Sequence, residues 1–242
     1  MRLPKSRFKG RWRTPEHYQE GMKNYYALMT EVDSACEKIV NELKARGLYN
    51  KTMIIFTTDN GLFHGAHGIG GKWMPYQESI RVPLIIYDPR MPQEKRGTLD
   101  HSFTLNVDLA ETILGAAGLK KDPLMQGRDI ADLYLQDGDA LVEPWRNEYF
   151  YEYPNGTGGA RPKSTALVRK DFKYIYWEDF AIEQLYNLEE DPQELEDVFD
   201  RPENQAIIEE MRARHDQLKR EVFEPCTRKD PKCDPFIYED FR

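Results

Sequence analysis

Hydrophobic residues near the start of the chain recur at the spacing of one helix face. Thr14 and Pro15 are residue types that begin helices, as the N-cap and the first helical position. Apolar side chains then follow at steps of three and four: Tyr18, Met22, Tyr25, Met29, Val32, Cys36, Ile39 and Leu43. The pattern predicts one long amphipathic helix that ends before Gly47. We expect its apolar stripe, Cys36 included, to pack in a core.

Two nearly continuous apolar runs follow the predicted helix. They are "TMIIFTTD" and "RVPLIIYDP", and each predicts a strand that is covered on both faces. "NVDLAETILGAAGL" then has the period of a helix, with Asn106 as its predicted N-cap and Gly118 near its end. Because strands and helices alternate, we predict a layered α/β domain over residues 1–143.

The pattern changes near Trp145. "NEYFYEY", "STALVRK" and "FKYIYW" predict three short aromatic strands, and "RPENQAIIEEMRARHDQLKREVF" predicts an amphipathic helix. We therefore expect a small antiparallel α+β subdomain over residues 144–242, with the tail lying on a surface. The glycine-rich stretch from Tyr153 to Arg161 is either an ordinary hairpin loop or a loop that helps to choose a substrate.

Composition excludes some classes of partner. The chain has 242 residues and a net charge of −8, which argues against binding of nucleic acid through phosphates. No apolar run approaches the roughly 20 residues of a membrane span. The first thirteen residues hold six Arg or Lys, either as a solvated end or as a basic rim for an anionic substrate. No apolar segment follows them, so no signal peptide is predicted and the compartment is left open.

The three cysteines are too few for a disulfide framework. They also match no zinc pattern with the available histidines. Cys226 and Cys233 are able to pair with each other only if the protein is exported.

The candidate chemistry lies in "TTDNGLFHGAHGIGGK", from Thr57 to Lys72. Asp59 and Asn60 follow a strand and offer hard oxygen ligands for Ca²⁺ or Mg²⁺, with Gly61 allowing a sharp turn behind them. Alone, these residues are more typical of an Asx turn. A lysine at position 72 is able to fold back beside an anion bound to the cation, an arrangement that stabilises charge on sulfuryl or phosphoryl oxygens. His67 is a candidate acid or hydrogen-bond donor.

These motifs resemble, in order, those of the sulfatases of the alkaline-phosphatase-like superfamily. The chain has Asp-Asn-Gly, Gly-x-His-Gly and Lys, then "YQESIRVPLIIYDP", "NVDLAETILGAAGL", "MQGRDIADL" and "FKYIYW…EQLYNLEEDPQE". The resemblance implies a partial alkaline-phosphatase-like α/β/α sandwich with a small C-terminal subdomain. It also implies a sulfuric-ester hydrolase for a sulfated carbohydrate or an aryl sulfate.

The resemblance also assigns roles to single residues. Asp59 and Asn60 match ligands of Ca²⁺, with Mg²⁺ as the alternative, Lys72 matches the lysine that contacts the sulfate group, and His67 matches a loop histidine. Zinc phosphatase relatives usually carry His where this chain has Asn60, so a sulfatase is favoured. A phosphonate or phosphate monoester hydrolase of the same superfamily is an alternative.

Sulfatases use a formylglycine nucleophile made in a C-x-P-S-R motif, which this chain does not contain. Cys233-Asp234-Pro235 continues with Phe-Ile and lies at the wrong end. The resemblance therefore implies a C-terminal half that is inactive alone, with the formylglycine in a missing N-terminal half. Expected partners are a sulfated small molecule or glycan, and either that half or a second copy of the chain. A non-catalytic sulfate- or cation-binding remnant is another alternative. Family members are often periplasmic, secreted or lysosomal.

Overall fold

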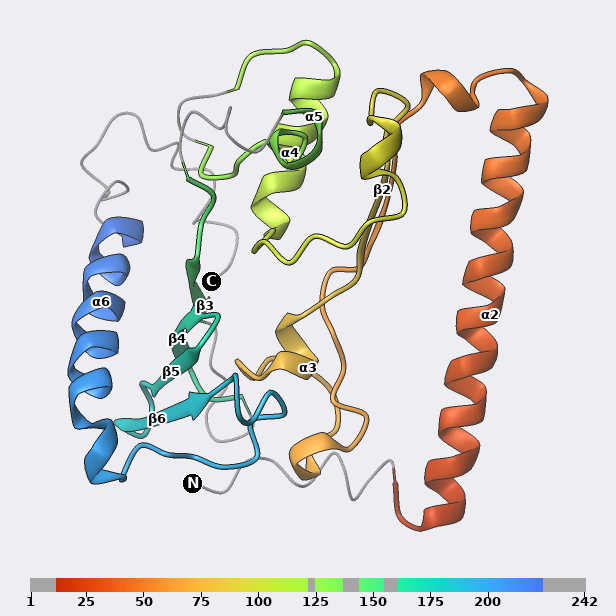
Figure 1. Ribbon diagram of the computed structural model, residues 1–242. Coiled ribbons are helices and arrows are strands. Elements are labelled where there is room, and N and C mark those ends of the chain that lie inside the picture. Colours follow the sequence, from red (N-terminus) through yellow and green to blue (C-terminus); the bar gives the residue numbers. More distant parts are fainter. Residues whose placement is uncertain (1–11, 122–124, 137–143, 155–160, 224–242) are drawn as a thin grey trace, which may run out of the picture. The chain divides into compact units, whose positions relative to one another are not determined.

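The chain forms two compact units in a computed structural model that describes residues 12–121, 125–136, 144–154 and 161–223 (Figure 1). The N-terminal unit comprises Arg2–Lys72 and Glu78–Asn147. The C-terminal unit comprises Trp73–Gln77 and Glu148–Arg242, so a short segment from the middle of the chain belongs to it. Antiparallel sheets and helices make up both units, which confirms a mixed α/β protein. No helix in the described ranges is long and apolar enough to cross a membrane.

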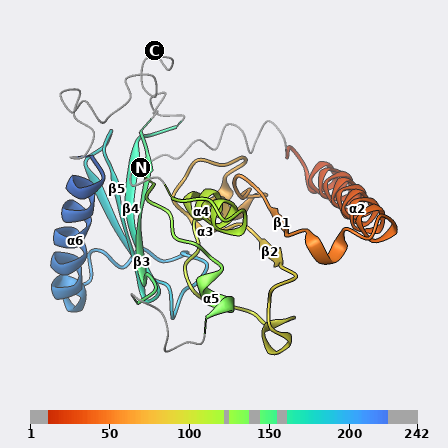
Figure 2. The same cartoon turned by 90° about the horizontal axis from the view of Figure 1, so that it is seen from above.

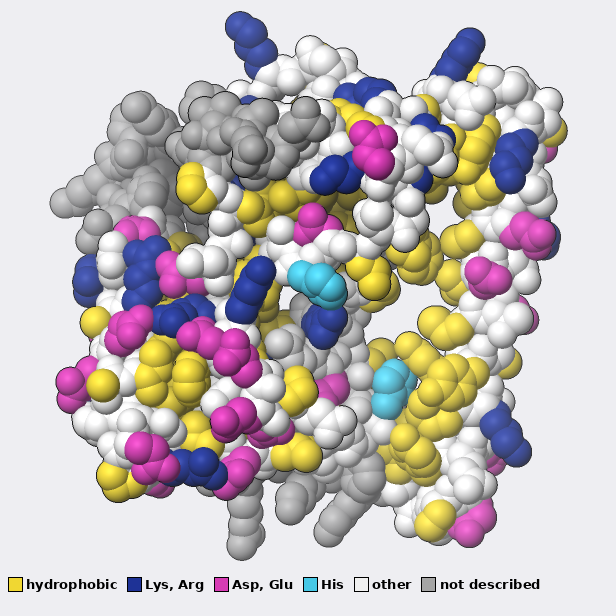
Figure 3. All heavy atoms as spheres, in the orientation of Figure 1, with side chains coloured by type: hydrophobic (Ala, Val, Ile, Leu, Met, Phe, Trp, Pro, Cys, Tyr) yellow, Lys and Arg dark blue, Asp and Glu magenta, His cyan; other side chains and the backbone are white. Residues whose placement is uncertain are grey.

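The predicted long helix is α2, Pro15–Ala45. Thr14 Oγ1 accepts a hydrogen bond from the His17 amide at 3.3 Å, and Gly47 follows the C-cap with φ 67°. The prediction that its apolar stripe is core was wrong, because α2 has no buried residue and Cys36 is only half-buried. Figure 3 shows hydrophobic side chains at the surface along α2. In the described chain its main element contact is the adjacent turn η1, Tyr49–Lys51, so no apolar layer covers the stripe.

The two predicted strands pair with each other. β1, Ile54–Thr57, and β2, Leu84–Tyr87, are antiparallel, with Phe56 opposite Ile85. One face is covered, because Leu84 and Ile86 of β2 pack on a buried cluster near α5, Asp132–Leu135. On the other face Ile85 is 62% exposed. The prediction of cover on both faces was therefore wrong, since the described residues supply a layer for one face only.

The C-terminal unit is a four-stranded antiparallel sheet in chain order. Its strands are β3, Glu148–Tyr153; β4, Ser164–Arg169; β5, Phe172–Trp177; and β6, Ile182–Asn187. The first three were predicted. β6 was not, because its sequence "IEQLYN" places two polar residues together in the middle of the strand and breaks the alternation.

Both faces of this sheet are covered. Helix α6, Gln205–Phe223, was predicted and lies along one face, where its Met211 packs with Leu167 and Leu185 (Figure 2). The segment Trp73–Gln77 covers the other face, since the Tyr76 ring lies 6.3 Å from that of Trp177. The segment that follows Lys72 directly is thus part of the C-terminal core.

Candidate active site

The loop that follows β1 is fastened by its own backbone. The Phe63 amide donates to the Gly71 carbonyl at 2.9 Å, and the Gly65 amide donates to the Ile69 carbonyl at 3.1 Å. Phe63 and Ile69 are each 2% exposed. The two apolar side chains therefore anchor the loop in the N-terminal unit, and its polar residues hold defined positions.

The glycine content of the loop has a backbone cause. Gly65, Gly68 and Gly71 have φ values of 102°, 67° and 105°, in a region that glycine adopts without steric cost. His67 also has a positive φ, 53°, which is uncommon for a residue with a side chain. Such strained conformations cluster at ligand sites, which supports a functional role for this loop.

Lys72 folds back onto Asp59 and Asn60. Its ammonium donates a hydrogen bond to Asn60 Oδ1 and lies 3.6 Å from Asp59 Oδ2. The side chain of Asp59 is 83% exposed, so this ion pair contributes little to stability. The Lys72 ammonium thus lies where the Asp59 carboxylate and the Asn60 amide oxygen converge, in a position that a ligand is able to reach.

Gly61 holds the Asp-Asn pair against the next helix. Its amide donates to the Ser79 carbonyl at 2.8 Å. A Cβ atom at Gly61 would lie 2.1 Å from the carbonyl oxygen of Glu78 in α3, Gln77–Ile80. Gly61 is not among the glycines with positive φ, so a left-handed backbone is not the reason for a glycine at this position. The glycine is required because two backbone segments approach each other closely.

Asn106 supports the site from a different element. Its Nδ2 donates to the carbonyl of Asp59 at 3.3 Å. Its prediction as an N-cap was wrong, because α4 runs Asn106–Ala116 and Leu105 precedes the first helical residue. The carboxylate of Asp108 instead accepts the Leu105 amide at 2.7 Å, so the Asn106 side chain is available to Asp59. Sequence reasoning missed this contact because the residues are far apart in the chain.

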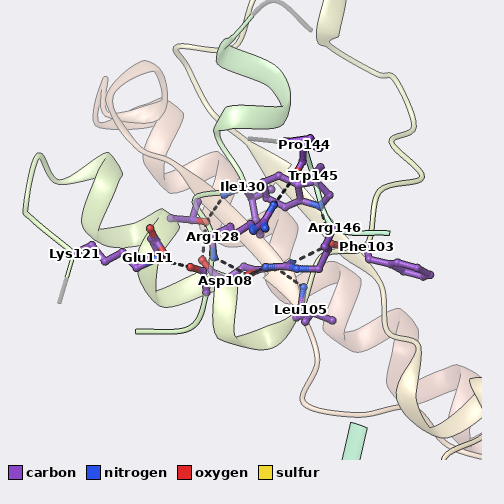
Figure 4. A network of polar contacts seen from close by, with 12 residues as sticks. Phe103, Leu105, Asp108, Glu111, Lys121, Arg128, Ile130, Pro144, Trp145 and Arg146 are labelled. Carbon is purple, nitrogen blue, oxygen red and sulfur yellow. Dashed lines mark hydrogen bonds and ion pairs between the residues drawn. The ribbon is translucent and has the colours of Figure 1, made fainter. Parts of the chain in front are cut away.

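A buried polar network fixes the start of α4 (Figure 4). Asp108 is 0% exposed, and the guanidinium of Arg146 donates to both of its carboxylate oxygens, at 2.7 Å for Oδ1. The Arg128 amide donates to Oδ1 at 2.8 Å. A fully hydrogen-bonded buried carboxylate of this kind holds one geometry. Asn106, two residues earlier, is therefore held in place relative to Asp59.

The structure brings His67 to a carboxylate that sequence reasoning did not single out. His67 Nε2 lies 3.3 Å from Glu78 Oε2, and the side chain of His67 is 11% exposed. Glu78 lies in the motif "YQESIRVPLIIYDP", eleven residues beyond His67, but no role was predicted for it from the sequence. The predicted role of His67 as an acid or donor stays a prediction. The ring of His64 packs at 4.3 Å from that of Tyr25, as in a structural role.

The donor chemistry fits a hard cation. Asp59 and Asn60 supply two side-chain oxygen ligands. Ca²⁺ and Mg²⁺ bind more oxygens than two, so a site for either ion needs further oxygen ligands from elsewhere. The part of the chain that the structure describes has no group of three or more His, Cys, Asp or Glu placed to hold a metal. Cys36 lies on α2, away from the loop in sequence, and Cys226 and Cys233 lie outside the described residues.

Comparison with known proteins gives consistent matches. A family profile described as N-sulphoglucosamine sulphohydrolase, C-terminal, matches residues 65–221, and one described as Sulfatase matches residues 2–119. N-acetylglucosamine-6-O-sulfatase of Bacteroides thetaiotaomicron is 31% identical over 190 residues, which are 77% of this chain and 33% of that protein.

Solved structures agree. A structure in complex with its substrate, D-glucosamine-2-N,6-O-disulfate, matches with a TM-score of 0.78 and 26% identity, covering 88% of this chain and 43% of that chain. Phosphonate monoester hydrolase of Agrobacterium radiobacter matches with a TM-score of 0.71 and 27% identity, covering 84% and 43%. The chain spans less than half the length of each of these relatives. The N-sulphoglucosamine sulphohydrolase profile matches well over half of the chain and describes a C-terminal part. The chain belongs to the sulfatase family.

Proposed function

We propose that the protein hydrolyses the sulfate ester of a sulfated carbohydrate or of an aryl sulfate, and that this chain supplies part of the active site. The observation that carries the proposal is the convergence of Asp59, Asn60 and Lys72 on one point. Hydrolysis of a sulfate ester develops charge on the non-bridging oxygens, which preorganised cationic groups stabilise. Lys72 is one such cationic group, and the oxygens of Asp59 and Asn60 offer a place for a second, a divalent metal ion.

Each residue then has a defined task. Lys72 donates to a sulfate oxygen, while Asp59 and Asn60 hold Ca²⁺ or Mg²⁺ through their oxygens. The cation, when bound, supplies positive charge to the sulfate oxygens. Glu78 orients the ring of His67, which is the candidate donor to the sulfate or leaving group. The hydrogen bond from Asn106 Nδ2 to the Asp59 carbonyl holds the two proposed metal ligands, Asp59 and Asn60, at the end of β1.

The nucleophile is proposed to be a formylglycine outside the sequence of this chain. The exposed apolar stripe of α2 and the exposed face of β1 and β2, where Ile85 lies, fit packing against the remainder of a sulfatase domain. Exposed apolar surface of this extent is typical of an interface. The chain alone is therefore expected not to turn over sulfate esters, because a nucleophile acts as one unit with the groups around it.

A sulfated amino sugar is the favoured substrate. N-acetylglucosamine-6-O-sulfatase is a relative, and a structural neighbour was solved with a disulfated glucosamine. A second candidate function, hydrolysis of a phosphonate or phosphate monoester, is favoured by the match to a phosphonate monoester hydrolase.

Turnover of four substrates by the complete protein tests both functions. The substrates are N-acetylglucosamine 6-sulfate, 4-nitrophenyl sulfate, 4-nitrophenyl phosphate and a phenylphosphonate monoester, each assayed with added Ca²⁺, Mg²⁺ or Zn²⁺. We expect kcat/KM to be highest for a sulfate ester with Ca²⁺ or Mg²⁺. Preference for the phosphonate would select the second candidate. Binding of N-acetylglucosamine 6-sulfate without any turnover would select the non-catalytic remnant.

A further inference from the structure

Glu78 contacts two separate parts of the loop that ends at Lys72. It lies in α3 and belongs to the N-terminal unit, as do Gly61, His67 and Lys72. Its backbone carbonyl lies so close to Gly61 that a Cβ atom there would be 2.1 Å from the carbonyl oxygen. Its carboxylate reaches the middle of the loop, where Oε2 lies 3.3 Å from His67 Nε2. One residue of α3 thus contacts both the start and the middle of the loop.

The contact between His67 and Glu78 is shielded from water. The two side chains are 11% and 27% exposed, and the facing atoms, Nε2 and Oε2, are both buried. The ring of Phe63 stands edge-on to the ring of His67, with the centroids 6.0 Å apart. Charges in such a position are screened by salt and water much less than charges at the surface. The pair, an ion pair when the ring is protonated, is therefore suited to fixing the loop.

The backbone at His67 supports a task for its side chain. His67 has φ 53°, in the left-handed region that a residue with a Cβ atom adopts only at a cost. The same loop has glycine at three other positions with positive φ, which are Gly65, Gly68 and Gly71. A glycine at position 67 would relieve the backbone in the same way, but it would remove the contact with Glu78.

The loop transmits the position of His67 to Lys72. Two backbone hydrogen bonds enclose His67, and the outer one joins the Phe63 amide to the Gly71 carbonyl at 2.9 Å. Lys72 follows Gly71 directly, and its ammonium donates to Asn60 Oδ1. The backbone from His67 to Lys72 is therefore part of one hydrogen-bonded turn. A shift of His67 would displace the Lys72 ammonium relative to Asn60.

We propose that Glu78 is a positioning residue for Lys72: its carboxylate holds His67 and, through the loop, fixes where the ammonium meets the sulfate group. The inference goes beyond the orientation of the His67 ring, and it rests on the proposed function for the role of Lys72. Without the charge of Glu78 the loop gains freedom, and Lys72 loses its fixed place. Displacement of a positioned group by about 1 Å costs about 10²-fold in rate.

Hydrogen exchange in the complete protein tests the hold on the loop without any substrate. Glu78→Gln keeps the size of the side chain and removes its charge. We expect the amides of Phe63 and Gly65 to exchange at least about fivefold faster in this variant, with wild-type rates elsewhere in the chain. The matched control, Glu94→Gln, removes an exposed charge from η3, Gln93–Lys95, and is expected to leave the rates unchanged. Wild-type exchange of the loop in Glu78→Gln would overturn the proposal.

A double-mutant cycle separates the positioning of Lys72 from a general loss of structure. The complete protein is assayed on 4-nitrophenyl sulfate, where Glu78→Gln is expected to lower kcat/KM about 10- to 100-fold. Glu78→Asp keeps the charge on a shorter side chain and is expected to lose less. In the Lys72→Ala background, Glu78→Gln is expected to cost less than about threefold, because the group that it positions is absent. An equal cost in both backgrounds would overturn the proposal.

Two further measurements separate the hold on the loop from proton donation by His67. His67→Gly adopts φ 53° without cost but lacks the contact, so we expect it to lower kcat/KM by about as much as Glu78→Gln does. We expect Glu78→Gln to cost the same factor for 4-nitrophenyl sulfate and for phenyl sulfate, whose leaving group depends more on an acid. A cost confined to phenyl sulfate would mean that Glu78 serves only proton donation, and it would overturn the proposal.

The outcomes keep this inference distinct from the proposed function. Faster exchange of the loop in Glu78→Gln, with no turnover of any sulfate ester by the wild-type protein, would refute the proposed hydrolysis and support the positioning of the Lys72 loop by Glu78. Turnover by the wild-type protein, with wild-type exchange and wild-type kcat/KM in Glu78→Gln, would refute the positioning role alone.

Discussion

The buried ion pair between Lys173 and Glu194 predicts a large effect on stability. Both side chains are 0% exposed, and Lys173 Nζ lies 2.5 Å from Glu194 Oε1. Glu194→Gln keeps an oxygen for the Gln77 amide but removes the negative charge, so a buried ammonium loses its counter-charge. Breaking one side of a buried pair costs about 3–5 kcal/mol. That loss is a large fraction of the roughly 5–15 kcal/mol by which a domain is stable.

A double-mutant cycle isolates the charge pairing. Lys173→Met together with Glu194→Gln removes both charges while retaining the acceptor for Gln77. We expect the double variant to be more stable than Glu194→Gln alone by at least about 1 kcal/mol, because no unpaired charge remains buried. The matched control is Glu196→Gln, which breaks the exposed pair with Arg201 and is expected to cost less than about 1 kcal/mol.

Urea unfolding gives the free energies, and hydrogen exchange of peptides from β4 and β5 shows that the loss lies in the C-terminal unit. Strictly additive effects of the two substitutions would refute the reasoning, since they would mean that the buried charges do not interact. A cost for Glu194→Gln as small as that of the exposed control would do the same.

Three further predictions concern the frame of the site and the core. Gly61→Ala places a Cβ against the Glu78 carbonyl, so we expect a loss of about 1–3 kcal/mol in urea unfolding and weaker Ca²⁺ binding by calorimetry; unchanged values would contradict the close approach. Asp108→Ala leaves Arg146 without its counter-charge, and urea unfolding should show a loss of about 3–5 kcal/mol, whereas a change under 1 kcal/mol would argue against the network. Burial lowers the pKa of His215 from its usual 6.5, so the unfolded state binds more protons below that pH and stability falls as pH drops. Melting temperatures at about pH 7.5 and about pH 5.5 should therefore differ more in wild type than in His215→Gln, and equal differences would refute this.

Local signals allowed the helices and most strands to be predicted. The cap at Thr14 and the C′ glycine at Gly47 act through hydrogen bonds and backbone angles a few residues away, so the sequence around them is sufficient. The convergence of Lys72 on the Asp-Asn pair was predicted from the family motif and the glycines between them. The packing of α2 was not, because an amphipathic stripe shows that a face is apolar but not whether the chain supplies its cover.

The supporting residues of the site were beyond sequence reasoning for a different reason. Glu78 and Asn106 act on His67 and Asp59 through single contacts between segments that tertiary packing brings together. The same holds for Gly61, whose role depends on a carbonyl of α3 and not on its own backbone angles. The role of the glycine-rich stretch from Tyr153 to Arg161 stays a prediction, because residues 155–160 lie outside the described residues.

The most direct test of the central claim is kcat/KM for sulfate-ester hydrolysis by the complete protein with Lys72→Ala. We predict a loss of about 10²–10³-fold, because one donor to developing charge is removed. Lys72→Arg is expected to fall between wild type and Lys72→Ala, and Lys51→Ala, an exposed lysine of η1, is the control for charge. An unchanged melting temperature would show that the fold is intact. Wild-type kcat/KM in Lys72→Ala would contradict the account.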